Sequence, residues 1–126
     1  MKHLKTCIVI SLDGFIARKD GDLNWMPGNI KKEISAAYEI PSVFIAGVNT
    51  YNMIFRNWGG WPYKSKKTFV VSHYDTNVTR KDNVTFLTDM PLRAINELKS
   101  SSETDIQVIG GGKFITSLIE ASLLDE

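Results

Sequence analysis

The apolar residues of this chain fall in short runs that polar segments separate. Five runs are rich in β-branched or aromatic residues and end at turn residues, which is typical of strands buried in a sheet. The first run is apolar at most positions, so we expect burial on both of its faces. The predicted strands are Leu4–Ile10, Ser42–Ala46, Lys67–Ser72, Val84–Leu87 and Ile106–Ile109.

Between these strands, apolar residues recur at the spacing of an amphipathic helix. Ile30 and Ile34 show this spacing ahead of the second strand, and Pro91 suits the first turn of a later helix. Asn49 or Thr50 is expected to cap the helix that follows the second strand. The predicted helices are Asn29–Tyr38, Tyr51–Phe55, Pro91–Leu98 and Lys113–Ala121.

The alternation of strands and helices predicts one α/β domain over residues 1–126, with a three-layer, mostly parallel, doubly wound sheet. In such sheets, ligands bind beside the carboxyl ends of the strands. The search for a functional site therefore narrows to the segments that follow strands, which are 11–25, 47–50, 72–76 and 110–112.

The charge and the cysteine content limit the possible partners of the protein and the compartment in which we expect it. The 126 residues carry a formal net charge of +1, and no basic run is longer than two residues, so we expect neither a nucleic-acid partner nor a membrane surface. No apolar stretch is long enough to span a bilayer. The one cysteine, Cys7, excludes an intrachain disulfide and suits a reducing compartment. We therefore expect a cytoplasmic protein with Cys7 in its core.

Three consecutive glycines, Gly110–Gly112, follow the last predicted strand and precede the last predicted helix. Glycines at such a turn let a phosphate approach the backbone, and the helix N-terminus offers unpaired N–H donors and the positive end of the helix dipole. The motif is neither G-x-G-x-x-G nor a P-loop, because Ile115 stands in the third glycine position and no Lys-Ser/Thr pair follows. The turn alone is equally consistent with a plain strand-to-helix connection.

Two other turns fall on the same expected edge of the sheet. Gly47 and Thr50 flank a second strand-to-helix turn, and Ser72 with His73 follows the third strand. A dinucleotide has phosphates to place at more than one such turn, although each turn alone also fits plain N-capping or a solvated loop. The sequence has no His/Cys cluster at metal-ligand spacing, so we predict no metal site. No G-x-S-x-G motif supports a hydrolase, and we assign no catalytic residue.

The chain resembles the dihydrofolate-reductase-like superfamily in four segments. It is most similar to the branch formed by the C-terminal reductase domain of the bifunctional riboflavin-biosynthesis deaminase-reductase. The resemblance covers almost the whole chain, and its most specific feature is the pairing of SLDGFIA near the start with GGG and DE near the end. The four segments, in chain order, are IVISLDGFIARKDGDLNW, VFIAGVNTYNMI, WPYKSKKTFVVSH and QVIGGGKFITSLIEASLLDE.

This resemblance implies an NADPH-dependent reductase of a small pyrimidine- or pterin-type heterocycle, such as 5-amino-6-(5-phosphoribosylamino)uracil, with NADH as the alternative cofactor. In this family the protein mainly orients the reactants, because hydride transfer is cofactor chemistry. The implied cofactor-binding residues are Val9, Ile10, Ile16, Ala17, Gly47, Thr50, Ser72, Gly110, Gly111 and Gly112. The implied substrate-binding residues are Asp13, Trp25, Asn29, Ile30 and Glu33.

Two positions depart from the family pattern. Dihydrofolate reductases hold the pterin ring with a carboxylate on the first helix, and that place falls here on Asn29 or Ile30, neither of which ionises. Glu33 lies one turn later, so folate ranks below the other substrates. Val48 replaces the basic residue that would clamp the 2′-phosphate of NADPH. The candidates to compensate are Lys64, Lys66 and Lys67.

The family pattern continues with further strands after Leu124, so we expect a domain truncated at its C-terminal strands. The next strand would pair beside Leu4–Ile10, and without it that strand becomes an open apolar edge. We therefore predict a homodimer in which two chains pair antiparallel through Leu4–Ile10. The alternative to a reductase is a catalytically incomplete nucleotide-binding or structural relic of the same fold, and dihydrofolate reductase is the second alternative.

Overall fold

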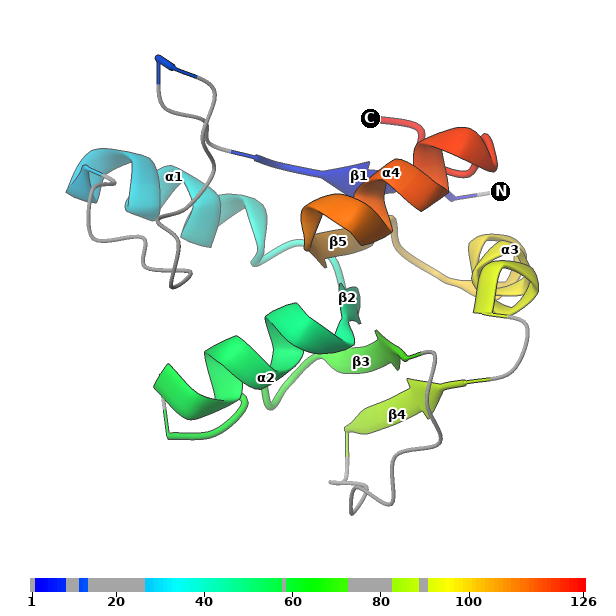
Figure 1. Cartoon of the computed structure of the whole chain (residues 1–126), viewed down its shortest axis with the longest axis horizontal. Coiled ribbons are helices and arrows are strands. Elements are labelled where there is room, and N and C mark those ends of the chain that lie inside the picture. The colour runs from blue at the N-terminus through cyan, green and yellow to red at the C-terminus, as the bar shows by residue number, and fades with distance from the viewer. Residues whose placement is uncertain (1, 9–11, 14–26, 58, 73–82, 89–90) are drawn as a thin grey trace.

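The computed structural model of the chain describes residues 2–8, 12–13, 27–57, 59–72, 83–88 and 91–126. Within these ranges it contains five strands and four helices, which are shown in Figure 1. In chain order they are β1 (Leu4–Thr6), α1 (Gly28–Ala37), β2 (Val43–Gly47), α2 (Val48–Asn57), β3 (Lys67–Val71), β4 (Val84–Leu87), α3 (Pro91–Ser101), β5 (Ile106–Gly110) and α4 (Gly112–Glu120).

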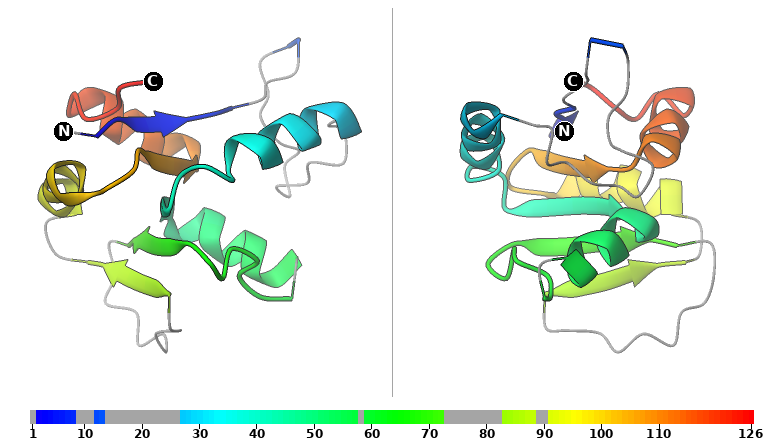
Figure 2. Two further views of the ribbon diagram at one scale, coloured as in Figure 1. Left: turned by 180° about the vertical axis from the view of Figure 1, so that it is seen from behind. Right: turned by 60° about the vertical axis from the view of Figure 1, so that its left-hand side comes forward.

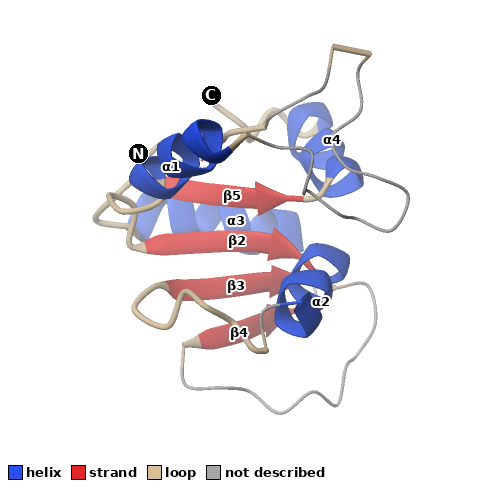
Figure 3. Cartoon of the chain, turned by 90° about the vertical axis from the view of Figure 1, so that its left-hand side faces the viewer, coloured by secondary structure: helices blue, strands red, loops and turns tan. Residues whose placement is uncertain are grey.

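These strands form one parallel sheet in the order β1-β5-β2-β3-β4. Figure 3 shows β5, β2, β3 and β4 side by side with their carboxyl ends on the same side. The last strand in the sequence, β5, lies between β1 and β2, so it joins the first strand to the rest of the sheet. The predicted α/β class with a mostly parallel sheet is confirmed.

Two separate hydrophobic clusters cover the two faces of the sheet. Successive side chains of a strand point to opposite faces, and in β2 Ile45 packs in a cluster with Ile95 of α3 and Leu118 of α4. Phe44 of the same strand packs in the other cluster, which includes Tyr51 of α2. Figure 3 accordingly shows α3 behind the sheet and α2 in front of it, which gives the predicted three layers.

Helix α1 extends away from the sheet, and only its C-terminal end lies close to the strands (Figures 1 and 2). Of the α1 side chains that the structure describes, none is buried. The contact with the sheet is made by the residue that follows the helix, Tyr38, whose ring lies 5.4 Å from that of Phe44 and 5.9 Å from that of Tyr63. An aromatic contact therefore holds α1 to the domain.

Strand β1 is shorter than predicted, and only its first residue is buried. It covers Leu4–Thr6 instead of Leu4–Ile10, because β5 pairs with these three residues only. Leu4 is fully buried, whereas Cys7 and Ile8 are exposed. The prediction that Cys7 belongs to the core is therefore wrong, since Cys7 lies beyond the last residue of β1 that pairs with β5.

Helix α2 begins directly after β2 and is longer than predicted. It covers Val48–Asn57 instead of Tyr51–Phe55, so Asn49 and Thr50 lie in its first turn and neither is its N-cap. Helix α3 continues to Ser101, and every other predicted element agrees with the structure to within one residue at either end. None of the helices in the described ranges is long and apolar enough to cross a membrane.

Strand β1 lies at one edge of the sheet, as predicted. This edge is not open along Leu4–Thr6. The amide of Asp125 donates to the carbonyl of Leu4 at 2.8 Å, and the amide of Thr6 donates to the carbonyl of Glu126 at 2.8 Å. The predicted homodimer through this edge stays a prediction.

Candidate functional site

The carboxyl ends of two neighbouring strands, β2 and β5, meet at one point of the sheet edge. Ala46 of β2 pairs with Gly110 of β5, and each strand runs almost directly into a helix. Helix α2 begins at Val48 and α4 begins at Gly112. Two helix N-termini, each with unpaired backbone N–H groups and the positive end of a dipole, therefore lie side by side.

A bulge between these strands places the glycine turn. Ile45 pairs with Val108, but the next residue, Ala46, pairs with Gly110, so Ile109 is the extra residue on β5. A bulge of this kind bends its strand and redirects the residues that follow it. Here it directs Gly110 and the peptide after it toward the first turn of α2.

Gly111 and Thr50 are in close contact across this point. A Cβ atom built on Gly111 would lie 2.9 Å from Oγ1 of Thr50, and one built on Gly110 would lie 3.7 Å from the same oxygen. Gly110 also has φ of +140°, a conformation that residues with a side chain rarely adopt. The peptide bond between Gly110 and Gly111 is cis. The positive φ favours glycine at position 110, and the close approach to Thr50 favours glycine at position 111.

Gly47 brings the backbones of the two turns together. A Cβ atom at this position would lie 3.4 Å from the carbonyl oxygen of Gly110 and 3.4 Å from Cβ of Phe114. Both distances are at the short limit of ordinary van der Waals contact, so the end of β2 packs directly against the turn after β5. The closeness of Phe114 to Gly47 could not be predicted, because in the sequence Phe114 is only one apolar position of a helix.

The charges at this point favour an anion. The first turns of α2 and α4 contain no acidic residue. Gly111 is the N-cap of α4 and has no side-chain oxygen to offer to the first amides of the helix. Lys113 is exposed in the first turn of α4 and adds a positive charge. These features together fit a phosphate group, which glycines without Cβ atoms would allow to approach the backbone.

Comparison with protein-family models matches residues 2–126 to the RibD C-terminal domain. The chain belongs to the RibD C-terminal domain family. A crystal structure of a "Putative riboflavin biosynthesis protein" from Shewanella sp. PV-4 is 30% identical and superimposes with a TM-score of 0.76, covering 99% of this chain and 73% of that one. The family resemblance and the dihydrofolate-reductase-like fold predicted from the sequence are confirmed.

Two curated relatives come from Bacillus subtilis (strain 168). "Uncharacterized protein YwjB" is 25% identical over 122 residues, which cover 94% of this chain and 70% of the relative. "Uncharacterized protein YyaP" is 25% identical over 134 residues, which cover 94% of this chain and 68% of the relative. Both relatives are thus related along nearly the full length of this RibD C-terminal domain.

The structure brings together four of the cofactor-binding residues that the family resemblance implied, namely Gly47, Thr50, Gly110 and Gly111. Gly112 follows them as the first residue of α4. The implied residues Val9, Ile10, Ile16 and Ala17, and with them Trp25 and His73, lie outside the described residues.

Ser72 lies at the same edge of the sheet as the glycine turn. It follows Val71, which pairs with Gly47 of the neighbouring strand. Its side chain is buried, and its amide donates to the carbonyl of Leu87 at 3.1 Å. Ser72 therefore joins β3 to β4 just below the surface where we expect the adenosine end of a dinucleotide.

The implied substrate residues lie on other elements. Asn29 and Glu33 are exposed on the first half of α1, and Ile30 beside them is half-buried. Asp13 is exposed in the segment between β1 and α1. These residues belong to the part of the domain that extends away from the sheet, and none of them belongs to β2, α2, β5 or α4.

Lysines that could replace the missing basic residue at position 48 were expected near the glycine turn. Lys66 and Lys67 lie instead at the amino end of β3, away from the carboxyl ends of the strands. Lys67 is the first residue of β3, and Lys66 precedes it, so about 13 Å of strand separates them from the carboxyl end. The ammonium group of Lys66 donates to the carbonyl of Glu39 at 2.7 Å. Val48 itself packs against the cluster around Phe44. Among the described residues of this RibD C-terminal domain, Lys113 in the first turn of α4 places a positive charge beside the glycine turn.

Three tyrosines pack in or against the hydrophobic cluster around Phe44 and do not belong to the site. Burial raises the pKa of Tyr38, Tyr51 and Tyr63, so their phenols stay neutral. The indole Nε1 of Trp61 donates to Oγ1 of Thr68 at 3.0 Å inside the same cluster. In the part of the chain that the structure describes, no three His, Cys, Asp or Glu side chains gather to hold a metal ion.

Proposed function

We propose that this chain is an NADPH-dependent reductase of a small pyrimidine- or pterin-type heterocycle, acting as in the reduction of 5-amino-6-(5-phosphoribosylamino)uracil. The observation that carries the proposal is the contact between Gly111 and Thr50, which lies between the N-termini of α4 and α2. Membership of the RibD C-terminal domain family supports it, as does the riboflavin-biosynthesis name of the Shewanella relative.

The residues around the glycine turn suit the pyrophosphate of a dinucleotide. The first amides of α4 and the hydroxyl of Thr50 would donate hydrogen bonds to phosphate oxygens, and Lys113 would offset part of their charge. Gly111 would let the phosphate reach the backbone. NADPH, when bound, supplies the hydride. The chain itself contributes binding, orientation and exclusion of water from the reacting groups.

The residue type at the start of α1 favours a uracil-like ring over a folate. The ring of dihydrofolate presents two neighbouring N–H donors, which a carboxylate can accept together. A uracil edge presents one acceptor and one donor, and the carboxamide of Asn29 carries the complementary donor and acceptor. Asn29 is exposed in the first turn of α1, where it is accessible to a ligand. We therefore place pyrimidines ahead of pterins as substrates.

Thermal unfolding with NADPH and with NADH tests cofactor binding first. A ligand that binds only the native state stabilises it by about 2.7 kcal/mol at a hundredfold excess over Kd, which moves the melting temperature of a domain of this size by several degrees. A Gly111→Val variant, in which a branched side chain fills the turn beside Thr50, is expected to lose this shift. No shift with either nucleotide in the parent protein would refute the proposed cofactor site.

Turnover is then measured as oxidation of NADPH in the presence of 5-amino-6-(5-phosphoribosylamino)uracil or dihydrofolate. The proposal expects oxidation with the pyrimidine and little with dihydrofolate. Binding of NADPH without oxidation by either substrate would favour the relic of the fold that binds nucleotides but does not react. Preferential oxidation with dihydrofolate would overturn the argument from Asn29.

A further inference from the structure

Helix α2 carries a row of exposed polar side chains. Asn49, Asn52 and Arg56 recur at the three- and four-residue spacing that places side chains on one face of a helix. Among the described residues, these three and the half-buried Phe55 line a hollow of about 460 Å³. Arg56 is the only charged residue of α2, so the helix contributes one positive charge to the hollow and no negative one.

The polar side chains of the hollow have no partner within the described ranges. There the structure gives Arg56, Asn49 and Asn52 neither an ion pair nor a side-chain hydrogen bond. The end of α2 is closed by the backbone, because the amide of Gly60 donates to the carbonyl of Phe55 at 2.9 Å. The guanidinium is therefore not engaged in capping the helix, and the described residues leave it available to a ligand.

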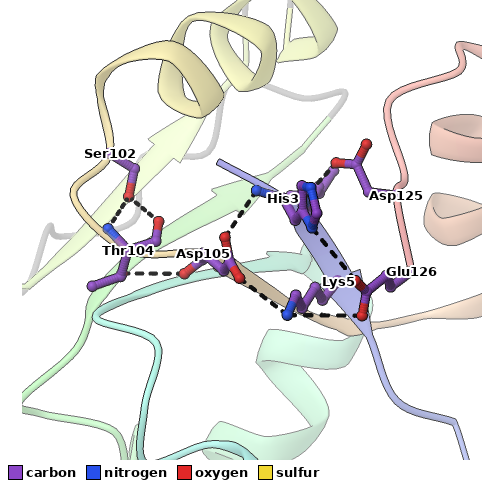
Figure 4. Close-up of polar contacts among 8 residues, drawn as sticks. His3, Lys5, Ser102, Thr104, Asp105, Asp125 and Glu126 are labelled. Atoms are coloured by element: carbon purple, nitrogen blue, oxygen red, sulfur yellow. Dashed lines mark hydrogen bonds and ion pairs between the residues drawn. The ribbon is translucent and has the colours of Figure 1, made fainter. Parts of the chain in front are cut away.

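Two cations elsewhere in the described chain lie beside carboxylates instead. Figure 4 shows Lys5 between Asp105 and Glu126, at 3.0 Å and 3.7 Å from their carboxylate oxygens. On α3, Arg93 lies 3.4 Å from a carboxylate oxygen of Glu97. The positive charge on α2 differs from these because no carboxylate of the described ranges lies within ion-pair distance of it.

The hollow lies on the side of α2 that faces away from β5. Successive residues of a helix are rotated by about 100°, so Asn52 points about 160° away from Thr50. The hydroxyl of Thr50 lies close to Gly111, in the turn that follows β5. The hollow is therefore separated from the glycine turn by the width of the helix and lies toward β3 and β4.

Ring contacts on this side of α2 lead to the same place. Phe55, which lines the hollow, lies 5.9 Å from the ring of Tyr51, and Tyr51 lies 5.6 Å from the ring of Phe86 in β4. Ser72 follows β3 on this side of the sheet. The hollow is thus on the side where we expect the adenosine end of a dinucleotide.

The hollow extends from the first turn of α2 toward the end of the helix. Asn49 precedes Thr50, and Arg56 lies seven residues after Asn49, which is about 10 Å along the helix axis. The Cα–Cβ bonds of a helix tilt toward its N-terminus, so the long side chain of Arg56 has its reach in the direction of the first turn. A ligand bound at the N-terminus of α2 therefore has a cation farther along the same helix.

We propose that this hollow binds the 2′-phosphate of NADPH and that Arg56 supplies the cation that Val48 cannot. The inference rests on the proposed function, because it requires a dinucleotide with its pyrophosphate at the glycine turn. One ribose separates the 2′-phosphate from the pyrophosphate, so its cation has to lie away from that turn. A guanidinium donates paired hydrogen bonds to phosphate oxygens, and the carboxamides of Asn49 and Asn52 add neutral donors. Arg56 then gives the chain its preference for NADPH over NADH.

Isothermal titration calorimetry of the 126-residue chain tests this assignment without turnover. The ligands are NADPH and NADH, which differ only in the 2′-phosphate, and the fragments 2′,5′-ADP and 5′-AMP, which differ in the same group. Arg56→Gln removes the charge but keeps a polar side chain. Arg93→Gln is the matched control, because it removes the same charge from an exposed arginine of α3.

We expect Arg56→Gln to weaken the binding of NADPH and 2′,5′-ADP by about tenfold or more, because a charge-assisted hydrogen bond to phosphate is lost. The Kd values of NADH and 5′-AMP should change by less than about twofold, and Arg93→Gln should leave all four Kd values within about twofold. Arg56→Lys keeps the charge but not the planar fork, so it should recover part of the affinity for NADPH.

Three results would overturn the assignment. Equal Kd values of NADPH for Arg56→Gln and the parent would mean that another group binds the 2′-phosphate. An equal loss for NADPH and NADH would mean that Arg56 acts on a part that both nucleotides share. Unchanged NADPH binding with a higher KM for 5-amino-6-(5-phosphoribosylamino)uracil would assign the hollow to the phosphate of the substrate.

Failure of the proposed function has a different signature. In that case the parent protein itself binds neither NADPH nor NADH, and both proposals are lost together. In each of the three results above, the parent still binds the nucleotide, so only the role of Arg56 is refuted.

Discussion

Replacing Gly111 with alanine is expected to destabilise the domain through a single contact. The added Cβ atom would lie 2.9 Å from Oγ1 of Thr50, well inside the separation at which nonbonded atoms attract. Gly111 has φ of −95° and ψ of −166°, which alanine adopts without strain. The cost is therefore steric, and it falls on the pairing of the turn after β5 with the first turn of α2.

The expected magnitude follows from two opposing effects. Overpacking of a close-packed site costs about 1–3 kcal/mol. Alanine offsets about 0.4–1 kcal/mol of this, because it restricts the unfolded chain more than glycine does. We expect a net loss of about 1–2 kcal/mol in the free energy of unfolding. For a domain of this size, that loss lowers the melting temperature by about 3–10 °C.

Urea and thermal unfolding of a double-mutant cycle measure the contact itself. The variants are Gly111→Ala, Thr50→Ala and the two together. Removing the Thr50 side chain removes the atom that the new Cβ meets, so the double variant should recover most of the loss caused by Gly111→Ala. We expect a coupling of about 1 kcal/mol, which exceeds the deviation seen for independent sites. Gly28→Ala is the control, since a Cβ atom there meets no atom within 4 Å.

Two results would refute this reasoning. If Gly111→Ala unfolds at the same urea concentration as the parent protein, the turn has room for a side chain and the close approach to Thr50 is not real. If the two substitutions add to within about 0.5 kcal/mol, the cost of the alanine arises elsewhere. In either case the glycine turn would lose the geometry on which the proposed cofactor site depends.

Three further predictions concern the edge of the sheet. Ser122→Gly should raise the free energy of unfolding by up to about 1 kcal/mol, because glycine adopts the positive φ of the helix end more easily; unchanged urea unfolding would contradict this. Lys99 and the amide of Leu4 lower the pKa of Asp125, so its contribution to stability is present above the ordinary pKa of an aspartate and is lost as the pH falls through the lowered pKa. In an acid titration of stability below about pH 4, Asp125→Asn should therefore fall less than the parent, and parallel curves would exclude this role. If two chains pair through the first strand, light scattering should give twice the 14.2 kDa chain mass, and Ile8→Lys should give the single-chain mass; an equal mass for both proteins would exclude that dimer.

The central strands could be predicted from the sequence because strands that are buried on both faces consist of consecutive apolar residues. The run Val43–Gly47 is buried at four of its five positions, and no turn residue interrupts it. The end of β1 could not be predicted in this way. The run continues through Cys7 and Ile8, but a strand ends where its neighbour stops pairing, and β5 pairs only as far as Thr6. How far two strands pair depends on the whole sheet, so the end of β1 cannot be found from the residues of the run alone.

In the candidate site, too, the residues of each turn could be predicted from the local sequence, whereas their contacts depend on the fold. The glycines and Thr50 could be located because strand-to-helix turns have a recognisable local chemistry. Their contact could not, because it depends on the bulge that sets Gly110 beside Ala46 and so turns Gly111 toward α2. Lys99 is a similar case. In the sequence it is one more lysine near a helix end, and its burial appears only when the segment containing Asp125 folds over it.

Residues 123–126, which bond to β1, and the glycine turn lie at opposite ends of β5, and this separation makes their contributions to stability independent. Leu4, whose carbonyl accepts from the amide of Asp125, pairs with Ile106 at the start of β5, whereas Gly110 is its last residue. Four steps along a strand span about 13 Å. Substitutions that far apart, without a shared contact, usually add in their effects on stability. Asp125→Asn should therefore leave the NADPH-dependent shift in melting temperature intact, and Gly111→Val should leave the exchange of the Leu4 amide intact. Loss of both properties in one variant would show that β5 transmits strain along its length.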